Sequence, residues 1–211
     1  MATEFLVGQV ALSAFRVANL KKALAEAGLA GCEVRTRWVF PMLTEGTLSA
    51  EAREKAKTLL DAGDAPLPRE GVFVAPRLGT ISPWSSKATD IFRTCSVAGV
   101  LRVERAMHLA LTRDGKVLAK ADLGAAANAI HDRMIEGVFT AAELEGLFIE
   151  AQPARGKVFD VLGEGREALV RANKEIGLAL SDPEIDYLFN AYTAAKRNPT
   201  DTELTMFGQV N

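Results

Sequence analysis

Apolar and polar residues alternate with two different periods through the first two-thirds of the chain. A period of two predicts strands at 5–10, 32–40, 71–76 and 100–111. A period near 3.6, with capping residues at its ends, predicts helices at 13–27, 49–60 and 86–94. The order strand, helix, strand, helix, strand, helix, strand is typical of an α+β fold.

Two residues interrupt these patterns. We expect Pro41 to end the strand at 32–40, because proline has no backbone N–H to donate to a neighbouring strand. Arg105 falls on the apolar side of the segment 100–111. A charged residue in that position needs a partner or a place at an edge, so we expect one of these for Arg105.

The last third of the chain has a helical pattern. Three segments fit the S/T-x-x-E capping box, beginning at Thr140, Ser181 and Thr200. Amphipathic patterns at 162–180 and 185–195 predict helices, with Gly163-Glu164-Gly165 at the entry to the first. The polar stretch 151–157, which contains proline and glycine, predicts a linker.

These patterns divide the chain into two domains. We expect an α+β domain in residues 1–150, with an antiparallel sheet and helices packed on one face. A small all-helical linker domain is expected to follow in residues 151–211. Hydrophobic residues make up 48% of the chain and charged residues 25%, which is ordinary for a protein with a packed core.

Charge and hydropathy exclude some functions. The net charge of −2 gives no basic field that would hold nucleic acid or anionic lipid. No apolar run approaches the roughly 18–20 residues that a membrane span needs, and the N-terminus lacks the features of a secretory signal. We therefore expect a cytoplasmic protein with no nucleic-acid or membrane partner.

The cysteines and histidines offer little chemistry by themselves. Cys32 and Cys95 have neither CxxC spacing nor a histidine cluster nearby, and two buried thiols are favoured over a disulfide. His108 and His131 cannot form a multi-histidine metal site. A hydrolase that uses one of the cysteines is one hypothesis, although neither has a base that the sequence reveals.

The densest group of polar residues precedes the helix expected at 86–94. Its members are Thr80, Ser82, Ser85, Ser86 and Lys87. Hydroxyls, free N–H groups and a cation at a helix start can hold an anion. The alternative is that Ser85 or Ser86 simply caps the helix. Trp84, in the same segment, either anchors an interface or pins the loop to its own core.

A second polar group is His131-Asp132-Arg133-Met134. A histidine beside an aspartate can indicate a general base, but adjacent residues point in different directions on any regular element. A hydrogen-bonded structural cluster is therefore favoured. Asp182, Glu184 and Asp186 are interpreted as acidic residues at a helix start, where negative charge is favourable, and not as a metal site.

Several blocks of the sequence, in order, resemble the opening portion of the large formylglycinamide ribonucleotide amidotransferase family, also called phosphoribosylformylglycinamidine synthase. The most specific blocks are Gly79 to Ile91 and Glu184-Ile185-Asp186-Tyr187-Leu188. The others include Val103-Glu104-Arg105, His131-Asp132-Arg133-Met134 and Met206-Phe207-Gly208-Gln209-Val210-Asn211. Together the blocks extend over nearly the whole chain.

The resemblance implies a fold, a function and partners. The family enzyme has a PurS-like N-terminal domain with ferredoxin-like halves, a helical linker, a synthetase region that uses ATP and Mg²⁺, and a glutaminase. Its catalytic, ATP-binding and metal-binding groups lie in the last two regions, which this chain lacks. The chain is therefore expected to be an inactive fragment with no catalytic, cofactor-binding or metal-binding residues of its own.

The role implied for such a fragment is to hold the synthetase and glutaminase domains, its expected partners, in register for ammonia transfer. The candidate interdomain or anion contacts are Thr80, Ser82, Trp84, Ser85, Ser86, Lys87, His131 and Arg133. The alternative is a stand-alone module that binds a phosphate-bearing small molecule at the 80–87 loop.

Overall fold

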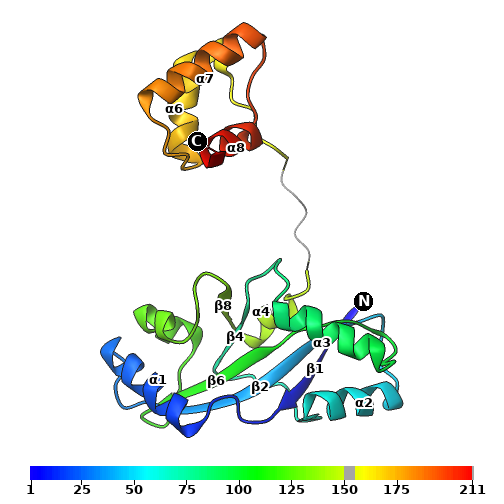
Figure 1. Ribbon diagram of the computed structural model, residues 1–211. Helices are drawn as coiled ribbons and strands as arrows, with labels where there is room; N and C mark the ends of the chain where they lie inside the picture. Colours follow the sequence, from blue (N-terminus) through cyan, green and yellow to red (C-terminus); the bar gives the residue numbers. More distant parts are fainter. Residues whose placement is uncertain (150–154, 211) are drawn as a thin grey trace. The chain divides into compact units, whose positions relative to one another are not determined.

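The computed structural model describes residues 1–149 and 155–210 of the chain. Its internal contacts divide the chain into two compact units, Met1–Ala151 and Gln152–Asn211 (Figure 1). Most of the predicted linker at 151–157 lies outside the described residues, and residues 155–157 are exposed and irregular. No helix among the described residues is long and apolar enough to cross a membrane.

The first unit is built on one antiparallel sheet. Its central strands run in the order β3-β1-β2-β6-β4-β8, while β5 pairs with β2 and β7 with β6. The strands are β1 (Ala2–Gly8), β2 (Glu33–Thr44), β3 (Ala62–Gly63), β4 (Val72–Pro76), β5 (Val100–Val103), β6 (Ala106–Arg113), β7 (Lys116–Val117) and β8 (Glu136–Phe139). The predicted α+β class with an antiparallel sheet is confirmed.

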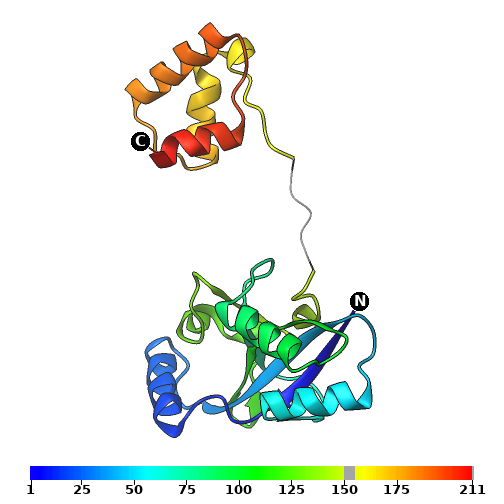
Figure 2. The same cartoon turned by 45° about the vertical axis from the view of Figure 1, so that its right-hand side comes forward.

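Three helices cover one face of this sheet (Figures 1 and 2). Helix α1 (Ala14–Glu26) packs against one end, while α2 (Ala50–Leu60) and α3 (Pro83–Thr94) pack against the other. The short 3₁₀ helices η1 (Lys120–Asp122) and η2 (Gly124–Ala129) lie near α1. Helix α4 (Ala141–Glu145) packs on the opposite face, over Val39 and Phe73.

Two predictions about the strands were wrong, and both concern the place where β2 passes the gap between β5 and β6. Strand β2 continues through Pro41 to Thr44, and the segment predicted as one strand at 100–111 is split into β5 and β6. The Pro41 carbonyl accepts from the Glu104 N–H at 2.9 Å, in the gap between β5 and β6. The missing N–H of Pro41 falls on the same side of β2, so it costs no ladder hydrogen bond.

Helix α3 begins earlier than predicted. Pro83 is its first residue and Ser82 its N-cap, whose Oγ accepts from the Ser85 N–H at 3.0 Å. Proline suits the first helical position because its missing N–H would have had no partner there. Trp84, Ser85, Ser86 and Lys87 therefore lie in the first turns of α3 and not in a loop. The prediction that Ser85 or Ser86 caps the helix was wrong.

The regular elements described in the second unit are helices, as predicted, and an isolated β-bridge joins Val158 to Thr200. The helices are α5 (Val161–Glu164), α6 (Arg166–Glu175), α7 (Asp182–Ala195) and α8 (Asp201–Val210). The single helix expected at 162–180 is broken at Gly165, which has a φ of 72°, and ends before Gly177, with a φ of 65°. Glycine adopts these angles without the steric cost that other residues incur.

The capping boxes at Thr140 and Thr200 are confirmed, because each threonine exchanges hydrogen bonds with the glutamate three residues later. At Ser181, the Glu184 carboxylate accepts from the backbone N–H and the hydroxyl, both at 2.6 Å. Asp182 and Asp186 form ion pairs with Arg166, which joins α6 to α7. These acidic residues thus stabilise the second unit.

Candidate functional site

A cavity of about 440 Å³ lies where α3 begins, in the first unit. Three residues from neighbouring strands line it side by side, because Met107 on β6 is paired with Trp38 on β2 and with Val74 on β4. The segments after β4, between β5 and β6, and before β8 complete the wall. Residues distant in the sequence therefore meet at one place.

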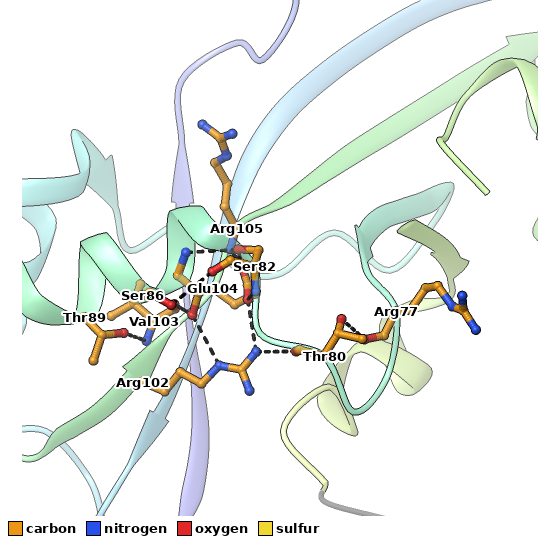
Figure 3. Close-up of polar contacts among 10 residues, drawn as sticks. Arg77, Thr80, Ser82, Ser86, Thr89, Arg102, Val103, Glu104 and Arg105 are labelled. Carbon is orange, nitrogen blue, oxygen red and sulfur yellow. Dashed lines mark hydrogen bonds and ion pairs between the residues drawn. The ribbon is translucent and has the colours of Figure 1, made fainter. Parts of the chain in front are cut away.

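A buried carboxylate lies beside this cavity. The Glu104 side chain is 0% exposed, and its Oε1 accepts from the Ser82 hydroxyl at 2.6 Å and from the Arg105 backbone N–H at 3.1 Å. Its Oε2 accepts from Arg102 at 3.1 Å and from the Ser82 N–H at 3.4 Å (Figure 3). These partners compensate for the removal of the charge from water.

Arg102 connects this carboxylate to the neighbouring segments. One terminal nitrogen, Nη2, donates to the Thr80 carbonyl at 2.7 Å as well as to Glu104, and Nε donates to Ser85 Oγ at 3.2 Å. The guanidinium carbon also lies 5.2 Å from the centre of the Phe148 ring. Arg102 therefore fixes the 77–82 loop against the start of α3.

Arg105 points away from this network (Figure 3). Its guanidinium carbon lies 4.3 Å from the Trp38 ring centre and 5.1 Å from that of Trp84, within the range of a cation–π contact. Burial lowers the pKa of Arg105, and the carboxylates of Glu104 and Glu136 partly oppose this shift. Arg105, which we expected to need a partner, thus has two aromatic partners, Trp38 and Trp84.

The hydroxyls that were candidates for an anion site all have partners in the protein. Thr80 donates to the Arg77 carbonyl at 2.6 Å, Ser85 to the Val103 carbonyl at 2.5 Å, and Ser86 to the Ser82 carbonyl at 3.5 Å. The negative charge near the start of α3 is that of Glu104, which accepts a hydrogen bond from the N-cap residue Ser82. The described hydroxyls of this segment are therefore used in contacts within the protein.

The other candidate residues lie apart from the cavity. Lys87 is exposed and, together with Trp84, lines a smaller cavity of about 200 Å³ between α2 and α3. His131 Nδ1 donates to the Ala127 carbonyl at 2.6 Å, and Arg133 is exposed. The Asp132 carboxylate accepts from the Met134 N–H at 2.8 Å. The described side-chain hydrogen bonds of His131 and Asp132 are thus with backbone groups.

Sequence reasoning did not select several residues of the cavity. They are Trp38, Arg77, Glu104, Arg105, Met134, Ile135 and Glu136. The one signal for them was Arg105, which interrupts an apolar pattern. The sequence gives no such signal for Glu104, because a glutamate on the polar side of a predicted strand is ordinarily exposed.

The cysteines correct one prediction. Both are free, but only Cys32 is buried, while Cys95 is exposed at the C-terminal end of α3. Over the ranges 1–149 and 155–210, no three His, Cys, Asp or Glu side chains are grouped so that they could hold a metal ion.

The fold and the site define an α+β unit with a preformed cavity, followed by a separate helical unit. Comparison with protein families matches each unit. Residues 37–148 match the formylglycinamide ribonucleotide amidotransferase N-terminal family, and residues 169–211 match the linker domain of the same enzyme. The chain belongs to the formylglycinamide ribonucleotide amidotransferase family, whose enzyme acts in purine biosynthesis.

Proposed function

We propose that this chain is the non-catalytic N-terminal and linker region of an ATP-dependent ligase. The ligase converts formylglycinamide ribonucleotide and glutamine to the corresponding amidine. The observation that carries this proposal is the pair of family matches, which follow each other along the chain in the order N-terminal domain, linker domain.

The role of the region is geometric. Ammonia released by a glutaminase is lost to water unless it reaches the synthetase site directly, so the domains that carry the two sites must be held in register. The first unit suits such a role because its polar residues brace one another. Arg102 and Glu104 fix the 77–82 loop to α3 through charge-assisted hydrogen bonds.

The contact surface of the region includes Trp84, Ser86 and Lys87 at the start of α3. Trp84 is half-buried and stacks on Phe40, with ring centres 5.8 Å apart, while Ser86 and Lys87 are exposed. Tryptophan is enriched in protein interfaces, where it serves as an anchor, and exposed polar groups are typical of the rim around such an anchor. His131 and Arg133 extend the proposed surface.

The test uses the full-length enzyme with Trp84→Ala and, separately, Lys87→Ala. We expect more glutamine to be hydrolysed per amidine formed, because the two sites are less well aligned. Lys21→Ala on α1 is the matched control, and circular dichroism checks that each variant is folded. A ratio of glutamate to amidine equal to that of the unaltered enzyme in both variants would discard the contact role.

A further inference from the structure

The cavity contains a cation, Arg105, whose N–H groups find no acceptor among the described residues. Within the described ranges, the Arg105 guanidinium makes cation–π contacts with Trp38 and Trp84, but its N–H groups have no hydrogen-bond partner. The two carboxylates in the wall attract this charge but make their hydrogen bonds elsewhere, Glu104 with Ser82 and Arg102, and Glu136 with the backbone N–H of Asp132. A guanidinium beside aromatic rings still presents planar N–H groups, which match a carboxylate in shape and charge.

The rim of the cavity is apolar and exposed. Ile81 is 63% exposed, Met134 79% and Ile135 64%, and all three line the same cavity. Exposed apolar residues gathered around a concave site mark a place of interaction.

The rim is also fixed in place. The Arg77 backbone N–H donates to the Ile135 carbonyl at 3.1 Å, and its side chain donates to the Met134 carbonyl at 3.4 Å. The two loops that carry the rim are therefore joined to each other. A partner that binds there has little backbone to order, which lowers the cost of binding.

We propose that this cavity binds a protein segment in which a glutamate or aspartate lies between apolar residues. The carboxylate pairs with Arg105, and the flanking apolar side chains cover Ile81, Met134 and Ile135. Ile81, Met134 and Ile135 line the cavity and also extend onto the exposed surface around it, so a protein segment with several side chains in a row fits both the cavity and its rim. The proposal deepens the contact role proposed above, since it states the chemistry of the partner surface.

The test uses the 211-residue chain and two synthetic peptides. One is acetyl-Ala-Leu-Glu-Leu-Ala-amide, and the other has glutamine in place of glutamate. The chain has two tryptophans, Trp38 and Trp84, and both line the cavity, so their fluorescence reports binding. We expect the glutamate peptide to bind about tenfold more tightly, as a charge-assisted hydrogen bond predicts.

Three variants separate the roles of charge and rim. Arg105→Met should abolish the preference for glutamate, and Arg105→Lys should keep part of it. Met134→Gln, at an exposed position, should weaken both peptides by a similar factor without changing their ratio. Met206→Gln, exposed in the second unit, is the matched control and should change nothing. Far-UV circular dichroism confirms that each variant is folded.

Several results would overturn the proposal. One is equal binding of the two peptides, and another is no saturation by either up to about 5 mM, a concentration at which weak contacts are still measurable. Saturable binding of phenylacetate or inorganic phosphate without peptide binding would show a small-ligand site instead. Self-association that buries the tryptophans would show that a second copy of the chain is the partner. The coupling ratio of the full enzyme tests the contact role separately.

Discussion

Glu104 shows how one buried charge organises its surroundings. Its carboxylate has acceptor contacts with Ser82, Arg102 and the Arg105 backbone, so both oxygens are used. A buried ion pair is weak support for stability as a whole, but removal of one partner leaves the other without compensation.

We therefore expect Glu104→Gln to lower the free energy of unfolding by about 2–4 kcal/mol, because the amide places a donor against existing donors. Urea unfolding measures the change. Glu33→Gln is the control, since Glu33 is exposed on β2 and weakly paired with Arg35, 3.8 Å away. Equal stability of the two variants would contradict the role of Glu104.

His108 makes stability depend on pH. Burial lowers its pKa, the hydrogen bond to the Glu70 carbonyl partly raises it, and Arg37 lowers it further. The unfolded chain then binds the proton more readily than the folded chain just below the ordinary value of 6.5. Stability that is present above this value is lost as the pH falls from 6.5 towards the folded pKa.

Urea unfolding at two pH values, one on each side of 6.5, tests this. We expect the unaltered chain to be less stable at the lower pH, and His108→Gln, which keeps a donor for Glu70, to show a smaller difference. Identical pH dependence of the two proteins would show that His108 does not titrate as described.

At the scale of elements, α3 begins where one serine serves two groups. Ser82 Oγ accepts from the Ser85 N–H and donates to Glu104. Ser82→Ala removes both contacts, so we expect a loss of about 2 kcal/mol, roughly twice that of an ordinary N-cap. Ser86→Ala should cost less than about 0.5 kcal/mol because Ser86 is exposed. Similar losses in thermal unfolding of the two variants would contradict this assignment of the cap.

The elements of the first unit show which features the sequence could predict. Periodicity predicted most strands and helices of the first unit, since one face of each is buried and the other is wet. It could not place the split between β5 and β6 or the passage of β2 through Pro41, because both depend on which strand lies beside which. The cavity around Arg105 was missed for the same reason: its residues meet only after the sheet is paired.

At the scale of the whole molecule, the hydrophobic clusters of the described residues do not mix the two units. The cluster of the second unit contains Phe159, Leu169, Ile185, Leu188 and Leu204 with their neighbours. Leu169→Ala should destabilise that unit by about 2–5 kcal/mol. Hydrogen exchange should then show faster exchange in α6, α7 and α8, with protection of β2 and β6 unchanged. Equal loss of protection in both units would mean that they unfold together.

We propose that this chain arranges catalytic domains and performs no chemistry alone. The most direct measurement incubates the purified, folded chain with formylglycinamide ribonucleotide, glutamine, ATP and Mg²⁺, and follows ADP and glutamate. We predict that neither product forms above the level of a protein-free blank. Turnover that follows the chain through successive purification steps would contradict the account.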